Sequence, residues 1–209
     1  MMDRRFDALL RQWQKRNIQG FAAELKADAA AKVLELLPPG ATVGLSGSVT
    51  LTELGIVEKL TQRGTKVINQ YLPSLTREES LRLRKEGAQA DYFLASPNAI
   101  AESGELIFLS AFGNRIAGVS NAKNVILVAG INKITQDVAS ALKRSREVAA
   151  PQNCRRLNYA SACFAEGVCR ENICFTPDYK RMCSQVLIIE AEIVPGRLSV
   201  IVVNEQLGY

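Results

Sequence analysis

The spacing of apolar residues changes near position 41. Over residues 3–37, apolar positions recur every three or four residues, which is the spacing of amphipathic helices. The two stripes are Phe6, Leu9, Leu10 and Trp13, and then Phe21, Leu25, Ala29, Val33 and Leu36. We therefore expect two helices with a break at residues 17–20, the second stopped by Pro38, Pro39 and Gly40. Their apolar faces would pack on the rest of the fold, or meet a partner or a second copy in a homo-oligomer.

From residue 41 onward, short apolar runs alternate with segments of helical spacing. The runs are ATVGLS, TKVINQY, DYFLAS, ELIFLS, NVILVAG, SQVLIIEAE and RLSVIVVNE. Strands that alternate with helices are joined by crossovers and build a mostly parallel sheet with helices on both faces. The sequence therefore predicts a doubly wound α/β domain over residues 38–209, preceded by N-terminal helices over residues 1–37.

A cysteine-rich segment, residues 154–184, interrupts this alternation, and we expect it to form an irregular insertion or lid. Cys163, Cys169, Cys174 and Cys183 follow the spacing C-x5-C-x4-C-x8-C, which has no C-x-x-C pair and so fits neither a thioredoxin-like pair nor a zinc ribbon. The chain has no histidine. Four thiolates bind zinc or hold an iron-sulfur cluster, and buried thiols without a metal are the third option. Cys154 lies in a helical stretch and is expected to be a core thiol.

Composition limits the classes of function. Hydrophobic residues make up 47% and charged residues 22%, as in an ordinary globular domain. The net charge of +5 comes from basic residues in short groups within helical stretches, which indicates solvated faces. With 6% aromatic residues and no motif, nucleic-acid binding is disfavoured. No apolar run reaches the roughly 18 residues of a membrane span, and we expect a cytoplasmic protein, in which clustered thiols indicate metal or redox chemistry.

In an open α/β sheet the ligand binds at the carboxyl ends of the strands. Ser46, Gly47 and Ser48 follow the first predicted strand of the domain, and small residues before a helix let backbone N-H groups approach an anion. The alternative is that Ser48 or Thr50 only caps the helix.

Other strand ends carry amide and cationic groups that suit a small anionic organic acid or a phosphorylated ligand. The candidate ligand-binding residues there are Asn98, Gly104, Asn114, Arg115, Asn132 and Lys133. We expect residues 102–104 to form a tight hairpin turn. Because the chain lacks histidine, the candidate acid-base groups are Glu53, Glu102 and Lys133.

Several of these loops resemble the LUD family, named for a lactate utilisation domain. The matching stretches are GLSGSVTLTELG, ADYFLASPNAIAESGEL, GNRIAG, NVILVAGINKITQD, VAAPQN and VNEQLGY. The resemblance implies the fold of the superfamily of ribose-phosphate isomerases, glucosamine-phosphate deaminases and CoA-transferases. It also implies a role in lactate-type oxidation with iron-sulfur redox subunits. With iron-sulfur subunits as the implied partners, the four cysteines favour an iron-sulfur cluster, of the four-iron type, over zinc.

The resemblance leaves the question of enzymatic activity open. Asn98 stands near the place of an aspartate in sugar-phosphate isomerases, and an amide cannot act as a general base. One alternative is an isomerase-like or CoA-transferase-like enzyme in which Glu53 or Glu102 works with Lys133 on a phosphorylated or CoA-linked substrate. Another is a non-catalytic regulatory module that binds an organic acid.

Overall fold

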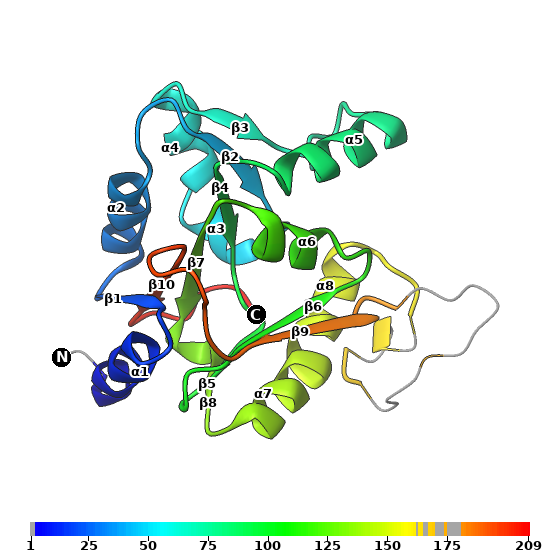
Figure 1. Ribbon diagram of the computed structural model, residues 1–209. Coiled ribbons are helices and arrows are strands. Elements are labelled where there is room, and N and C mark those ends of the chain that lie inside the picture. The colour runs from blue at the N-terminus through cyan, green and yellow to red at the C-terminus, as the bar shows by residue number, and fades with distance from the viewer. Residues whose placement is uncertain (1–2, 162, 165–166, 170–173, 175–180) are drawn as a thin grey trace.

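The structure is a computed structural model that describes residues 3–161, 163–164, 167–169, 174 and 181–209 (Figure 1). In this part of the chain ten strands form two sheets. The strands are β1 (Gln19–Ala23), β2 (Thr42–Leu45), β3 (Lys66–Ile68), β4 (Tyr92–Ala95), β5 (Ala99–Ala101), β6 (Leu106–Ser110), β7 (Asn124–Gly130), β8 (Ile134–Thr135), β9 (Gln185–Ile189) and β10 (Leu198–Val203). The predicted α/β fold with a mostly parallel main sheet is confirmed.

Eight α-helices cover these sheets in the described residues. They are α1 (Arg4–Gln14), α2 (Lys26–Leu36), α3 (Val49–Glu53), α4 (Ile56–Gln62), α5 (Arg77–Gly87), α6 (Asn114–Asn121), α7 (Val138–Arg144) and α8 (Ala150–Arg156). A 3-10 turn, η1 (Ile131–Lys133), follows β7, and a π-helical turn, η2 (Ser145–Ala149), joins α7 to α8. Pro151 lies in the first turn of α8, where a missing N-H group is tolerated.

The main sheet is parallel throughout, in the order β1-β10-β7-β4-β2-β3. Along β7 the side chains alternate between its faces, so Val125 and Leu127 join one core cluster while Ile126 and Val128 join the other. The first cluster packs against α1, α6 and the second sheet, and the second packs against α2, α3 and α4. Both faces of the sheet are therefore buried.

The second sheet has the order β8-β5-β6-β9. β5 and β6 form an antiparallel hairpin, whose turn is closed by Gly104 N-H donating to Ala101 O at 2.8 Å, as the sequence predicts for residues 102–104. Ala141 of α7 packs against its Ala99 and Ile107. The alternation of apolar runs does not reveal that these strands leave the main sheet, since an apolar run has the same pattern in either sheet.

The N-terminal region differs from the prediction. The stretch 21–23, expected to open the second helix, belongs to strand β1, which pairs with β10 at the edge of the main sheet (Figure 1). The helix α2 begins only at Lys26. Phe6, Leu9 and Trp13 of α1 are fully buried in the core, and Trp13 Nε1 donates to Gly104 O at 2.9 Å. The apolar face of α1 is therefore explained by packing on the fold.

Topology creates one switch point in the main sheet. From β2 the chain moves outward to β3, and from β4 it moves in the other direction to β7 and β10. The connections after β2 and β4 therefore diverge at adjacent strands, which opens a crevice at their carboxyl ends. Within the described residues, no helix is long and apolar enough to cross a membrane.

Candidate anion-binding cleft

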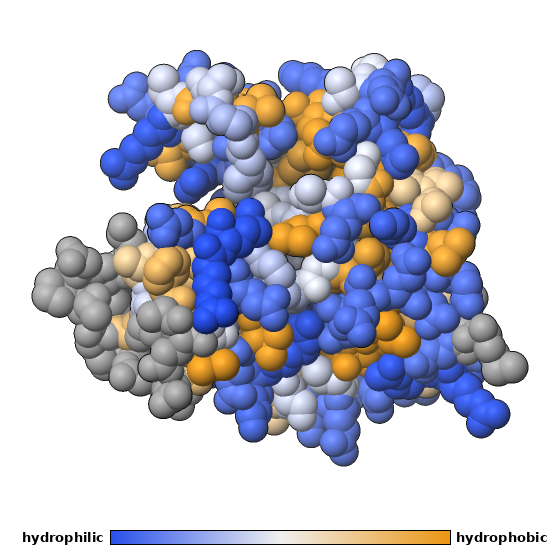
Figure 2. Space-filling view, turned by 180° about the vertical axis from the view of Figure 1, so that it is seen from behind, coloured by the Kyte–Doolittle hydropathy of each residue, from blue (hydrophilic) through white to orange (hydrophobic). Residues whose placement is uncertain are grey.

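A cavity of about 430 Å³ lies at this switch point. Its floor comes from the residues that follow β2 and β4, and its walls include residues before α5 and from α6 and α8. Figure 2 shows the surface hollowed below the part of the molecule that carries α5. The fold thus places a concave site where a doubly wound sheet binds its ligand.

Lys133 is a buried polar residue of the cleft lining. The residue is 3% exposed, and its Nζ donates to Thr50 Oγ1 at 2.9 Å and to Ser96 Oγ at 2.8 Å. Burial, and then the nearby Arg144 and Arg115, hold the pKa of the Lys133 amine well below its usual value, and Glu53 partly opposes them. The amine is therefore placed among hydroxyl groups and cations.

Arg115 fixes the loops on both sides of the cleft. Its guanidinium donates to Gly47 O at 2.6 Å and to Asn98 Oδ1 at 3.0 Å. Asn98 Oδ1 also accepts the N-H of Leu109 at 2.8 Å. Because this amide oxygen accepts two hydrogen bonds, Asn98 serves as a structural link between β4, β6 and α6.

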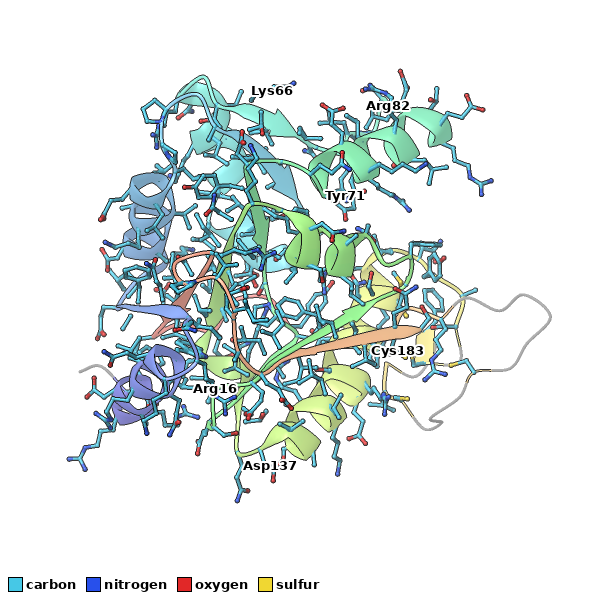
Figure 3. All side chains as sticks on the ribbon, viewed as in Figure 1. Arg16, Lys66, Tyr71, Arg82, Asp137 and Cys183 are labelled. Atoms are coloured by element: carbon cyan, nitrogen blue, oxygen red, sulfur yellow. The ribbon has the colours of Figure 1, made fainter. Side chains whose placement is uncertain are left out.

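The side chains of Tyr71 and Asn114 form another wall of the cleft. Tyr71, between β3 and α5, accepts a hydrogen bond at its hydroxyl from Asn114 Nδ2 at 2.9 Å, and its ring packs over Gly47, where a Cβ atom would lie only 3.1 Å from it (Figure 3). A side chain at position 47 would therefore crowd this ring. The small residue predicted for close approach leaves room here for the Tyr71 ring.

The lining is cationic. The described residues that line the cleft include three arginines, Arg84, Arg115 and Arg156, and the amine of Lys133, and they include no aspartate or glutamate. Arg84 Nε and Ser46 Oγ are buried and have no hydrogen-bond partner among the described residues. Unsatisfied buried donors in a positive cavity are the groups that an anionic ligand would satisfy.

Most of the predicted ligand-binding residues come together here. Those that line the cleft are Ser46, Gly47, Ser48, Asn98, Asn114, Arg115 and Lys133. The capping alternative also holds in part, because Ser48 Oγ accepts the N-H of Leu51 at 3.3 Å at the start of α3. Thr50 does not cap a helix, since its hydroxyl lies between Lys133 and Leu207 O.

Four predicted residues lie elsewhere. Glu102 and Gly104 belong to the β5-β6 turn beside α1, where Arg5 and Trp13 are their neighbours. Asn132 faces the C-terminal segment and bonds Leu207 N and Gly208 O. Glu53 accepts the N-H of Gly208 at 2.8 Å and does not line the cleft. The strand-end rule selects the edge of the sheet where the cleft lies, but it does not say which way each side chain turns.

Comparison with known proteins now identifies the family. The family model for the LUD domain matches residues 7–203, which is most of the chain. The chain belongs to the LUD domain family. A solved structure of a DUF162 family protein from Deinococcus radiodurans has a TM-score of 0.53 at 15% identity, covering 96% of this chain and 94% of that one. At this identity the likeness shows a shared fold.

Other solved structures resemble parts of this LUD protein. Ribose 5-phosphate isomerase A from Methanocaldococcus jannaschii matches 54% of the chain, and 55% of its own length, at 14% identity and a TM-score of 0.36. The enzyme from Neisseria gonorrhoeae matches 63% of the chain, and 61% of its own length, at 16% identity and a TM-score of 0.36. No curated protein matches the chain.

Sequence reasoning missed several residues of the LUD protein's cleft. Ser96 directly follows β4, and Thr50 lies in the first turn of α3, the helix after β2, so the strand-end rule could have included both. Arg84 and Arg156 were interpreted as solvated faces of helices, but both line the cleft. Tyr209 reaches the cleft as well, and its hydroxyl accepts from Arg156 Nε at 2.7 Å.

The cysteines of the LUD protein do not form a ligand set in the described residues, where no three cysteine, histidine or carboxylate side chains are grouped to hold a metal ion. Cys154 is buried as expected for a core thiol, and it lies 3.8 Å from Cys163, measured between the sulfur atoms. Cys183, at the start of the strand-forming segment, accepts from Arg181 Nε at 3.2 Å (Figure 3). Cys174 is buried and Cys169 is half-buried. A four-cysteine metal centre stays a prediction.

Proposed function

We propose that this LUD protein binds a small organic acid anion in the strand-end cleft and serves lactate-type oxidation together with iron-sulfur redox subunits. Membership of the LUD domain family supports a role related to lactate utilisation. The observation that carries the proposal is the cleft lining, which has three arginines and Lys133 and no carboxylate among the described residues. A site with this charge attracts anions and rejects cations.

The cleft favours a carboxylate over isomerase-like chemistry. An isomerase that moves a proton at carbon needs a general base within hydrogen-bond reach of the substrate. Glu53 and Glu102, the predicted carboxylate bases, lie outside the lining, whereas Lys133, the third acid-base candidate, lies inside it, and Asn98 is an amide already engaged by Arg115 and Leu109. Binding and orientation of an anion therefore account for the residues present better than carboxylate-based proton transfer does.

The first experiment is isothermal titration calorimetry with L-lactate, pyruvate, inorganic phosphate and a neutral amide, lactamide. We expect lactate or pyruvate to bind and lactamide not to bind, because the amide carries no charge for the arginines. Binding of phosphate or a phosphorylated sugar, without binding of either carboxylate, would overturn the organic-acid assignment and favour the isomerase-like or CoA-transferase-like alternative.

A matched pair of variants on α5 tests whether the cleft is the site. Arg84 lines the cleft, whereas Arg82, on the same helix, points into solvent and pairs with Glu86 at 3.2 Å (Figure 3). Arg84→Gln should weaken binding by about tenfold, the effect of a single charge-assisted hydrogen bond, and Arg82→Gln should leave it unchanged. Equal effects of the two variants would show that the anion binds elsewhere.

The proposed place in electron transfer has its own test. Iron-sulfur subunits that oxidise lactate would be assayed for reduction of an artificial acceptor, with and without this chain. We expect the chain to raise the rate and Arg84→Gln to remove part of the gain. A rate independent of the chain would leave it as a binding and regulatory module, the remaining alternative.

A further inference from the structure

Lys133 carries a chemistry that anion binding does not use. Its amine comes from η1 at the end of β7, at the floor of the cleft, and is 3% exposed. Its hydrogen-bond partners are the hydroxyl groups of Thr50 and Ser96. In the described part of the chain no carboxylate lies within ion-pair distance of it. A buried ammonium group is ordinarily paired, so this arrangement suits a neutral amine.

The hydrogen bonds agree with the neutral form. Thr50 Oγ1 donates its own proton to Leu207 O at 3.2 Å, and Ser96 Oγ has Pro97 O and Thr50 Oγ1 as acceptors at 3.4 and 3.3 Å. Both hydroxyl oxygens therefore accept from Lys133. A neutral amine has two N-H groups and one lone pair, whereas an ammonium group has three N-H groups and no lone pair. With two donors engaged, the lone pair stays available for a ligand.

The groups around Lys133 also favour the neutral amine. Burial and the positive charges of Arg144 and Arg115 lower the pKa of Lys133, as in enzymes that use a lysine as a nucleophile. Arg115 and Arg84 also line the cleft, so a carboxylate has cationic partners there. A molecule with a carboxylate next to a carbonyl group would meet the arginines with one group and the amine with the other.

We propose that Lys133 forms a reversible imine with the carbonyl carbon of a 2-oxo acid bound in the cleft, an inference that rests on the proposed function. The Lys133 Nζ lone pair attacks the carbonyl carbon, and a carbon-nitrogen double bond replaces the carbon-oxygen double bond. The carbonyl oxygen leaves as water with the two hydrogens of the amine. Thr50 and Ser96 lie at hydrogen-bond distance to relay these protons. No electrons are exchanged, and addition of water restores both partners.

This chemistry gives the cleft a preference for the oxidised member of a 2-hydroxy acid and 2-oxo acid pair. Both members carry the carboxylate for the arginines, but only the 2-oxo acid has a carbonyl carbon for the amine. The protein would therefore retain the product of oxidation in preference to its substrate.

Reductive trapping tests the inference. The protein would be incubated with pyruvate and sodium borohydride at neutral pH, and its mass and tryptic peptides measured. We expect a mass gain of one pyruvate less one oxygen atom, on the peptide that contains Lys133. Lactate should give no gain. Lys123→Met, which changes an exposed lysine paired with Asp91 at 2.7 Å, should keep the labelling, and Lys133→Met should lose it.

Outcomes of trapping and of calorimetry separate the two proposals. Peptide mapping of the wild-type protein locates the label without relying on the fold of a variant. Label on surface lysines alone, or no label while lactate and pyruvate bind in calorimetry, would overturn the imine and leave anion binding intact. Absence of binding by both acids would overturn the proposed function itself.

Discussion

The strand-end cleft and the cysteine segment both gather reactive side chains, but they are held in different ways. In the cleft, contacts cross the fold, as when Arg115 of α6 donates to Gly47 O at 2.6 Å and Lys133 donates to Ser96 Oγ at 2.8 Å. The described thiol contacts include short-range ones, such as Arg181 with Cys183 and Cys163 with Cys154. The sheet therefore sets the cleft geometry before any ligand binds, whereas a thiol cluster in an irregular segment would depend on a metal to assemble it.

The metal content of the protein gives the largest expected difference. If the cysteine segment holds an iron-sulfur cluster, anaerobically purified protein will be brown, and Cys169→Ser with Cys174→Ser will remove the iron and the broad visible absorption entirely. Cys154→Ser serves as the control, because Cys154 lies in α8 and belongs to the core. If the wild-type protein is colourless and contains zinc, the cysteine segment holds a zinc site and not an iron-sulfur cluster. If the wild-type protein contains no metal, the four thiols have a structural role.

Removal of the Lys133 amine should change stability in a direction opposite to most core changes. Lys133→Met replaces a desolvated amine by an apolar side chain of similar length. We expect the midpoint temperature of the ligand-free protein to rise by about 2–4 °C, the shift that roughly 1 kcal/mol produces in a chain of this size. Calorimetric unfolding at pH 7 measures it, and a fall in the midpoint would contradict the view that the amine lacks a charge partner.

The pH dependence sharpens this prediction. The pKa of Lys133 is lower in the folded protein than its usual value of 10.5, so the unfolded chain binds more protons between these two pKa values. The stability that Lys133 contributes therefore rises with pH across that window. Arg144, Arg115 and Glu53 are the charged groups that act on the amine. The difference in midpoint between Lys133→Met and the wild type should shrink as the pH approaches 10.5.

Alkylation compares the thiols directly. Burial raises the pKa of Cys154 to about 12, and the residue is 1% exposed, so little of it is thiolate near neutral pH. With iodoacetamide at pH 8, Cys154 should react more than about tenfold more slowly than the half-buried Cys169 and Cys183. Peptide mass spectrometry over time follows each cysteine separately. Equal rates would show that the segment opens far enough to expose the core thiol.

The parts of the fold that sequence could predict are those governed by local spacing. The runs that became β2, β4, β7 and β10 have the apolar pattern of buried parallel strands, and the residues after them had to meet at one edge. β1 escaped prediction because Phe21 fits a helical stripe that continues into α2 as well as it fits a strand. Arg84 and Arg156 escaped it because their helices converge on the cleft only through tertiary packing. The sequence shows how many thiols the segment has but not where they lie, because spacing in an irregular segment does not fix the distances between sulfur atoms.

The smallest expected effect on ligand affinity concerns Asn132 and the C-terminal segment that it contacts. Asn132 was predicted to bind the ligand, but its amide accepts from Leu207 N at 3.1 Å and donates to Gly208 O at 3.0 Å. Asn132→Ala should therefore cost about 1–3 kcal/mol of stability, the value of two ordinary hydrogen bonds. Affinity for the anion should fall only a few-fold, because Thr50 and Ser96 still hold Lys133.

Urea unfolding and calorimetry of Asn132→Ala measure these two quantities on one protein. A loss of affinity as large as that of Arg84→Gln, with unchanged stability, would show that the amide contacts the ligand after all. The C-terminal segment would then open to admit it, and the preformed geometry of the cleft would hold only for its arginine wall. If Asn132→Ala instead loses stability but still binds the anion, the contrast with the cysteine segment becomes stronger. The cleft would then keep its function after one of its supports is removed.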